Sequence, residues 1–161
     1  MPKRRLSSAD DADPIAGPPP RLLALRLLGR RDYTTQELLE RLTDKGVPPD
    51  EAAATVTALA AEGLVDDRRA AAAHVRTASR VKGRGPRRIR LELEARGVRG
   101  ADADEAMREL SPEETADVLK RLLARKAAGG LRSREDRDRL FRQLIRRGFS
   151  VTAIEKALKE P

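Results

Sequence analysis

Three stretches of this chain, LLERLTDKGV (38–47), IRLELEARGV (89–98) and LFRQLIRRGF (140–149), carry the same pattern of residues. Their glycines, Gly46, Gly97 and Gly148, are spaced by 51 residues both times. A leucine stands four residues before each glycine, a basic residue directly before it and an apolar residue directly after it. The pattern indicates a structural unit that is present three times.

Each offset from the glycine has a meaning in a helical corner. The apolar residues eight and four positions before it share one face of a helix. The basic residue complements the negative end of the helix dipole, and the glycine takes the left-handed conformation that ends a helix. The apolar residues six and ten positions after it share a face of the next helix; they are Ala52 and Val56, Ala103 and Met107, and Ile154 and Leu158.

The remaining helices are predicted from capping signals and apolar spacing. Thr34 with Glu37, and Ser111 with Glu114, have the spacing of a capping box, and Ser133 is placed as a cap after the flexible loop AAGGLRS. Tyr33 and Leu38 are also spaced for a hydrophobic staple. With the corners, these signals predict helices near 20–31, 66–80, 86–96, 112–126 and 134–147.

The chain is therefore predicted to be all-α, with three tandem three-helix repeats in an elongated, curved array. We expect the repeats to span 19–64, 65–110 and 111–161. Each repeat is too small to bury much surface alone, so neighbouring repeats should pack on one another. Residues 1–18, rich in Pro, Asp and Ser, are expected to form a disordered tail.

Composition excludes several classes of protein. The 161 residues include no cysteine, which excludes disulfides and thiolate metal sites. No stretch resembles a signal peptide or approaches the roughly 18 apolar residues of a membrane span. We therefore expect a cytoplasmic protein that does not bind membranes.

No catalytic or metal constellation stands out in the sequence. His74 is the only histidine and lies in an alanine-rich helix, where a packed or surface role is the simpler interpretation. Asp66 and Asp67 resemble a carboxylate pair for a metal, but helix capping explains them equally well. There is no glycine-rich phosphate loop with lysine and Ser/Thr. We expect no enzyme activity, cofactor, metal or small-molecule substrate.

Positive charge is concentrated in two segments of a chain whose net charge is +8. Residues 76–99 hold nine basic residues against two acids, and residues 120–147 hold eleven against three. Such concentrations indicate a polyanion or an acidic protein groove as partner. In the helix near 112–126, however, acids come first and bases last, which the helix dipole alone accounts for.

The helix near 86–96 has the opposite order. Pro86 suits its first position, so Arg87 and Arg88 lie in the first turn, where cations cost about 0.3–1 kcal/mol each. Free N–H groups at a helix start attract anions. We therefore predict a receptor for carboxylates or phosphates, formed by Lys82, Arg84, Arg87, Arg88 and Arg90.

A second basic stripe is predicted on the helix near 134–147. Arg139, Arg142 and Arg146 fall at i, i+3 and i+7, on a different face from Leu140 and Leu144. The stripe is either a contact surface or a solvated face, and the sequence leaves both interpretations open.

Four segments in their order and spacing resemble the RecX family, regulatory proteins of the bacterial RecA recombinase. They are ALRLLGRRDYTTQELLERLTDKGV (24–47), AAEGLVDDRRAAAAHVR (60–76), KGRGPRRIRLELEARGV (82–98) and LIRRGFSVTAIEKAL (144–158). The resemblance implies a monomer of three tandem three-helix repeats. It also implies binding in the groove of the RecA filament on single-stranded DNA, with inhibition of ATP hydrolysis and strand exchange.

Two points qualify what the resemblance implies. The family usually has aromatic residues where this chain has Ala70 and His74, so the second repeat is expected to pack more loosely. Three-helix units also resemble helix-turn-helix domains, and direct, sequence-independent DNA binding through the basic helix face is the alternative function.

Overall fold

The computed structural model describes residues 17–127 and 133–159. Most of the expected tail, residues 1–16, and the centre of the expected flexible loop, residues 128–132, lie outside the described residues.

All regular structure in the described ranges is α-helical. Nine helices follow one another, and none of them is long and apolar enough to cross a membrane. They are α1 (Pro20–Leu28), α2 (Thr35–Asp44), α3 (Pro49–Ala61), α4 (Asp67–Arg80), α5 (Pro86–Glu94), α6 (Gly100–Met107), α7 (Pro112–Ala127), α8 (Arg134–Arg146) and α9 (Val151–Lys159).

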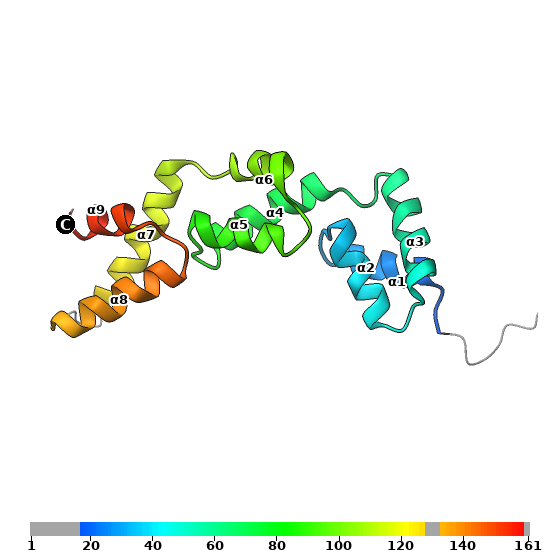
Figure 1. The fold of residues 1–161 in the computed structure, drawn as a ribbon, viewed down its shortest axis with the longest axis horizontal. Coiled ribbons are helices and arrows are strands. Elements are labelled where there is room, and N and C mark those ends of the chain that lie inside the picture. Colours follow the sequence, from blue (N-terminus) through cyan, green and yellow to red (C-terminus); the bar gives the residue numbers. More distant parts are fainter. Residues whose placement is uncertain (1–16, 128–132, 160–161) are drawn as a thin grey trace, which may run out of the picture.

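The helices build three separate hydrophobic cores, each from three consecutive helices. Leu38 and Leu42 centre the first core, Ile89 and Leu93 the second, and Leu144 the third. We call the three groups the first module (α1–α3), the second module (α4–α6) and the third module (α7–α9). Figure 1 shows them side by side in a long, gently arched molecule. The predicted fold class is confirmed, whereas the boundaries at 64/65 and 110/111 stay a prediction.

The repeated glycines end α2, α5 and α8 as the pattern predicts. Gly46, Gly97 and Gly148 have φ values of 87°, 85° and 93°, in the left-handed region where a side chain is strained. The apolar residue after each glycine donates its N–H to the carbonyl of the leucine five residues earlier, which closes the corner. These bonds are Val47 to Leu42 at 3.1 Å, Val98 to Leu93 at 3.0 Å and Phe149 to Leu144 at 3.2 Å.

Capping residues stand where the sequence places them. Thr34 forms a full capping box with Glu37, and Ser133 caps α8. Ser111 accepts from the backbone N–H of Glu114 at 3.0 Å, but the Glu114 carboxylate pairs with Arg80 of α4 at 2.7 Å. The third module is thereby tied to the second at the start of α7.

Two apolar details differ from the sequence expectation. The first helix ends at Leu28 rather than near residue 31, because glycine, a poor helix former, follows at Gly29. Leu158 is 45% exposed, although its repeat equivalent Val56 is buried. Leu158 lies near the end of the last described helix.

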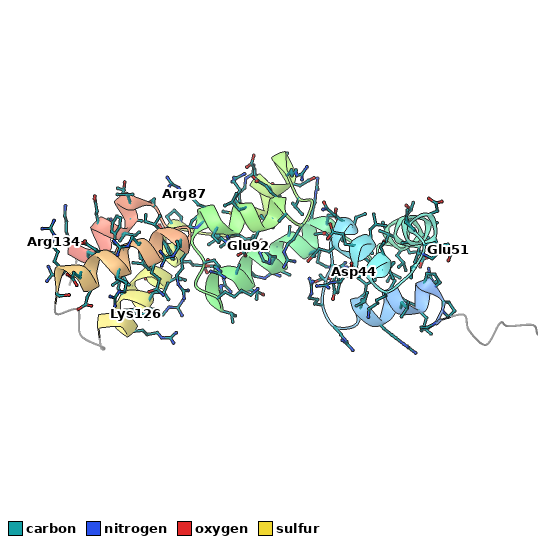
Figure 2. All side chains as sticks on the ribbon, turned by 60° about the horizontal axis from the view of Figure 1, so that its bottom comes forward. Asp44, Glu51, Arg87, Glu92, Lys126 and Arg134 are labelled. Atoms are coloured by element: carbon teal, nitrogen blue, oxygen red, sulfur yellow. The ribbon has the colours of Figure 1, made fainter. Side chains whose placement is uncertain are left out.

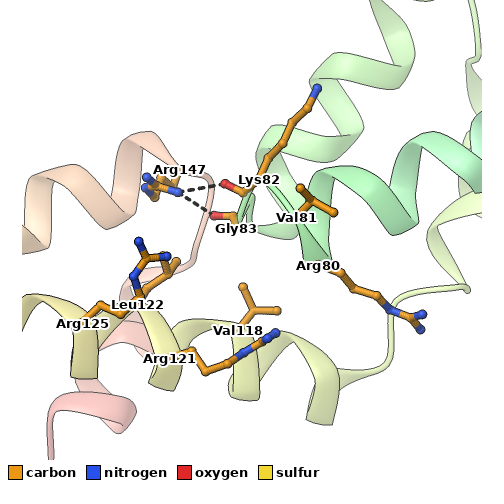
Figure 3. Close-up of a pocket in the computed structure, with 9 residues that line it drawn as sticks. All are labelled: Arg80, Val81, Lys82, Gly83, Val118, Arg121, Leu122, Arg125 and Arg147. Atoms are coloured by element: carbon orange, nitrogen blue, oxygen red, sulfur yellow. Dashed lines mark hydrogen bonds between the residues drawn. The ribbon is translucent and has the colours of Figure 1, made fainter.

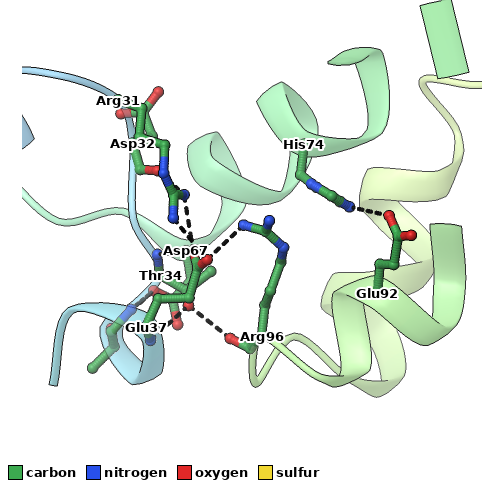
Figure 4. A network of polar contacts seen from close by, with 9 residues as sticks. Arg31, Asp32, Thr34, Glu37, Asp67, His74, Glu92 and Arg96 are labelled. Carbon is green, nitrogen blue, oxygen red and sulfur yellow. Dashed lines mark hydrogen bonds and ion pairs between the residues drawn. The ribbon is translucent and has the colours of Figure 1, made fainter. Parts of the chain in front are cut away.

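The first and second modules meet at a polar joint around the start of α2 (Figure 4). The Thr34 hydroxyl donates to the carbonyl of Arg96 at 2.6 Å, and the Arg96 guanidinium pairs with Glu37 at 2.6 Å. Burial opposes ionisation of Glu37, but hydrogen bonds from Arg31 and the Thr34 N–H, with the charge of Arg96, hold its pKa below the usual value. The joint therefore fixes an ionised carboxylate between two arginines.

The aspartate pair has two different roles. Asp66 caps α4 by accepting from the N–H of Arg69 at 3.0 Å, as predicted. Asp67 does not cap its own helix: it accepts from the N–H and hydroxyl of Thr35 at 2.6 and 2.8 Å and so caps the start of α2 across the joint. Within 17–127 and 133–159, no three His, Cys, Asp or Glu side chains are grouped to hold a metal ion.

Ala70 and His74, which stand where the family usually has aromatic residues, lie beside an open cleft. Ala70 and His74 are buried, and together with Ala73 they line a hollow of about 350 Å³ that also contacts Arg31 and Arg96. A hollow at this place agrees with the looser packing that the missing aromatic side chains predict.

Candidate partner-binding surface

The basic segment 82–90 lies where the second module meets the third. The N–H of Gly85 donates to the carbonyl of Arg147 at 2.7 Å, and the N–H of Arg87 donates to the carbonyl of Gly148 at 3.1 Å. The α8–α9 corner therefore occupies the start of α5. The sequence analysis expects free N–H groups at this helix start, but the N–H of Arg87 is not free, because the carbonyl of Gly148 accepts from it.

Two glycines allow this close contact. A Cβ atom on Gly85 would lie 2.5 Å from the carbonyl of Gly148, and one on Gly148 would lie 2.5 Å from the Cβ of Arg88. At the other joint the carbonyl of Arg96, which stands 51 residues before Arg147, accepts a hydrogen bond from the side-chain hydroxyl of Thr34 instead of from a backbone N–H. Thr34 and Gly85 both stand twelve residues before their module's corner glycine. The two joints are therefore repeat-equivalent.

Glu92 on α5 gathers three of the basic side chains around it. Its carboxylate lies 3.0 Å from Arg88 Nε, 3.6 Å from Arg84 Nε and 3.0 Å from His74 Nε2. Arg84 Nε is buried and has no hydrogen-bond partner in the described structure. Arg84 and Arg88 thus share one acid of their own module, which offsets one of their two positive charges.

His74 and Glu92 form a contact in which the pKa of each group is lowered, for different reasons (Figure 4). Burial lowers the pKa of His74, helped by the positive charge of Arg96 and opposed by Glu92. Burial also works against ionised Glu92, but the hydrogen bond from Arg88 and the contact with His74 outweigh it, so that the pKa of Glu92 falls below its usual value. The pair is best described as a carboxylate beside a neutral imidazole.

The other three basic residues of segment 82–90 differ in whether they form an ion pair. Arg90 pairs with Asp104 of α6 at 2.7 Å rather than with Glu94, its i+4 neighbour. Lys82 and Arg87 are exposed, and neither side chain makes an ion pair with any residue the structure describes. Of the five basic residues predicted to bind a partner here, only these two keep an unpaired charge.

The predicted stripe on α8 is present. Leu140 and Leu144 are buried in the third core, whereas Arg139, Arg142 and Arg146 are exposed. The three arginines make no ion pair with the described part of the chain. The structure therefore leaves them available to a partner without showing that one binds.

A basic cleft at the second joint was not predicted from the sequence. It has a volume of about 230 Å³ and lies between the end of α4 and α7 (Figure 3). No acidic residue lines it. Its lining consists of Arg80, Val81, Lys82, Gly83, Val118, Arg121, Leu122, Arg125 and Arg147.

The helix dipole explains the positions of the cleft arginines only in part. Arg121 and Arg125 suit the end half of α7, and Arg147 suits the end of α8, so the helix dipole accounts for each one. In the structure Arg147 also reaches the second module, where its Nη1 donates to the carbonyls of Lys82 and Gly83 at 2.9 and 3.2 Å. The i, i+4 spacing of Arg121 and Arg125, beside the buried Leu119 and Leu123, was the available signal.

Charge increases along the array. Residues 19–64 hold six basic residues against seven acids, 65–110 hold twelve against eight, and 111–161 hold thirteen against eight, for net charges of −1, +4 and +5. Figure 2 shows charged side chains covering the outside of the molecule from end to end. The positive surface therefore belongs to the second and third modules and to the joint between them.

Comparison with known proteins agrees with this architecture. Models of the first and second three-helix domains of RecX match residues 21–59 and 66–107. A crystal structure of regulatory protein RecX superposes with a TM-score of 0.74 at 24% identity, covering 88% of this chain and 70% of that one. RecX from Lactobacillus salivarius superposes with a TM-score of 0.72 at 22% identity, covering 88% and 93%.

Sequence relatives cover nearly the whole array. The regulatory protein RecX of Chromohalobacter salexigens is 40% identical over 142 residues, which are 86% of this chain and 90% of that protein. RecX of Halorhodospira halophila is 38% identical over 135 residues, or 83% of each chain. With three helical modules in the same order and this identity over most of its length, the chain belongs to the RecX family of regulatory proteins.

Proposed function

We propose that this protein binds the filament that the RecA recombinase forms on single-stranded DNA and slows its ATP hydrolysis and strand exchange. The observation that carries the proposal is the long arched array of three cores, joined at two repeat-equivalent corners. Membership of a family of regulatory proteins supports the regulatory role.

The shape suits a helical partner for a physical reason. A filament presents the same surface repeatedly along a helical path, and an array of modules can contact several copies in succession. Each contact raises the effective concentration of the next module, so weak contacts add to a tight one. The two repeat-equivalent joints hold the modules in a regular spacing, which simultaneous contacts require.

The structure also sorts the eight arginines and lysines predicted to bind the partner. Lys82, Arg87 and the α8 stripe of Arg139, Arg142 and Arg146 have unpaired, exposed charges, so they are the proposed contacts. The other three, Arg84, Arg88 and Arg90, are paired within the second module, and their proposed role is to hold its surface in shape.

The test is the ATPase activity of RecA on single-stranded DNA, titrated with this protein. We expect inhibition, with Arg87→Glu weakening it and Arg30→Glu, a change at another exposed arginine in the first module, leaving it unchanged. Inhibition well below one protein per recombinase subunit would indicate that filament ends are capped, whereas a stoichiometric requirement would indicate occupancy of the groove. An ATPase rate that does not change at any ratio refutes the proposal.

Direct DNA binding is the rival function, and the net charges of +4 and +5 in the last two modules favour it. Against it, the aromatic side chains of the described chain serve the cores: Tyr33 and Phe149 are buried, and Phe141 packs on the third core. Single-strand binders usually stack bases on exposed aromatic rings. Binding to bare and to RecA-coated DNA should be compared over a salt series, because phosphate contacts weaken steeply with salt.

A further inference from the structure

The basic cleft between α4 and α7 combines two kinds of surface. Arg121 and Arg125 extend from α7, and neither pairs with any acid in the described ranges. Arg147 uses only its Nη1 on backbone carbonyls, so its other N–H groups stay available. Arg80 is offset by Glu114. The cleft therefore offers three guanidinium groups with donors to spare and no acid in its lining.

The other surface of the cleft is aliphatic. Val81, at its edge, is 79% exposed, the largest exposed fraction among the exposed large apolar side chains of the described chain. Val118 and the half-buried Leu122 lie on the α7 side. Figure 3 shows the Lys82 ammonium directed away from α7, so the arginines and these aliphatic groups define the cleft.

This mixture distinguishes between possible ligands. A phosphodiester backbone would use the arginines but would gain nothing from Val81 and Leu122, and no aromatic ring lines the cleft to stack a base. Protein interfaces, by contrast, are enriched in arginine and bury aliphatic side chains at their centre. An acidic peptide segment with an aliphatic side chain would match both surfaces at once.

We propose that this cleft is a docking site for such an acidic, partly aliphatic segment of a partner protein. Its carboxylates would accept hydrogen bonds from Arg121, Arg125 and Arg147, and its aliphatic side chain would cover Val81. The inference rests on the proposed regulation of RecA only for the partner's identity, and it assigns the cleft to the recombinase protein rather than to DNA.

The direct test needs no recombinase. The probe is a fluorescein-labelled acidic octapeptide containing two leucines, whose binding is followed by fluorescence anisotropy. Arg121→Glu with Arg125→Glu should weaken binding by roughly tenfold or more, since two favourable ion pairs become repulsions. Val81→Ser should weaken it by roughly fivefold through lost apolar burial. None of these three side chains makes a hydrogen bond or an ion pair within the described fold, and circular dichroism checks that the variants remain folded.

Two matched controls isolate the cleft. Arg26→Glu with Arg30→Glu makes the same charge change at the same spacing on the first module, and it should leave peptide binding unchanged. An octapeptide in which serine replaces both leucines should bind more weakly to the wild type and be indifferent to Val81→Ser. Equal loss in the control variant would show a general charge effect and overturn the proposal, and so would no detectable binding of the leucine peptide.

A nucleic-acid arm separates the remaining alternative. Unstructured oligothymidylate should bind the wild type and Val81→Ser equally. If the double substitution Arg121→Glu with Arg125→Glu abolishes oligonucleotide binding but leaves peptide binding intact, the cleft is a phosphate site and the proposal is wrong. In the RecA ATPase assay, failure of the wild type to inhibit would refute the proposed function and leave the peptide result standing. Inhibition that is intact in the cleft variants would refute the docking site alone.

Discussion

The three repeated glycines provide a test of the joints, because they have the same backbone conformation but different surroundings. A Cβ on Gly46 would meet no atom within 4 Å, one on Gly97 would lie 2.5 Å from the side-chain oxygen of Gln36, and one on Gly148 would clash with the backbone of Arg88. A Gly→Ala change has the same effect on the unfolded chain at all three sites. Differences among the variants therefore report what the added methyl group meets.

The expected losses of stability follow from these contacts. Gly46→Ala should cost only the left-handed conformation, about 1–2 kcal/mol. Gly97→Ala adds a clash with Gln36: moving its side-chain oxygen to another rotamer costs about 0.5–1.5 kcal/mol. Its Cβ, 2.9 Å from the added methyl group, requires a small shift of α2 as well. Gly148→Ala forces the second and third modules apart and threatens the hydrogen bonds of Gly85 and Arg87, a further loss of about 1–3 kcal/mol.

Urea unfolding followed by circular dichroism at 222 nm measures these losses, and small-angle X-ray scattering measures the shape. We expect the order Gly46→Ala, Gly97→Ala, Gly148→Ala in increasing destabilisation. Only Gly148→Ala should change the radius of gyration under native conditions. If Gly46→Ala and Gly148→Ala are equally destabilised and scatter identically, the corner does not contact α5 in solution and the joint described above is refuted.

Three further outcomes are expected from thermal unfolding. Folding lowers the pKa of His74 below its usual 6.5, so the unfolded chain binds a proton at a higher pH than the folded chain does. The melting temperature should therefore fall as the pH drops below about 6.5, and His74→Gln should remove this dependence. Glu92→Gln should remove a second loss, which begins below about pH 4.5, because the folded carboxylate is ionised beside Arg88. Thr34→Ala should cost about 1–3 kcal/mol by removing a cap and the bond to Arg96, whereas Thr34→Ser should keep most of that stability.

The fold could be predicted from the sequence because its signals are local. A glycine at each corner, a leucine four residues earlier and a capping threonine or serine each act within one or two turns of helix. The order of three modules then follows from repetition. The predicted end of α1 lies about three residues too late, because the prediction continues the helix past Gly29, where the apolar spacing has already stopped at Leu28.

The binding surface was less predictable because pairing between distant residues decides it. The i, i+4 spacing in the sequence indicated the Arg88–Glu92 pair. It could not show that Arg90 forms an ion pair with Asp104, or that the N–H of Arg87 donates to the carbonyl of Gly148. Those contacts join residues 14 and 61 positions apart in the chain. Arg121 was not predicted as a binding residue, because the helix dipole already explained a basic residue at its position. Its place in the cleft follows only from the packing of α4 against α7.

Two main-chain hydrogen bonds, from Gly85 to Arg147 and from Arg87 to Gly148, form the closest part of the joint between the second and third modules. The Arg147 guanidinium and the Arg80–Glu114 ion pair add side-chain contacts beside them. Hydrogen bonds between main-chain atoms do not depend on the identity of the surrounding exposed side chains, provided that Gly85 and Gly148 are retained. Substitutions elsewhere on the surface can thus alter affinity for a partner without altering the bend of the molecule. For the helical partner proposed above, the strength of binding can therefore change while the length and curvature of the array stay constant.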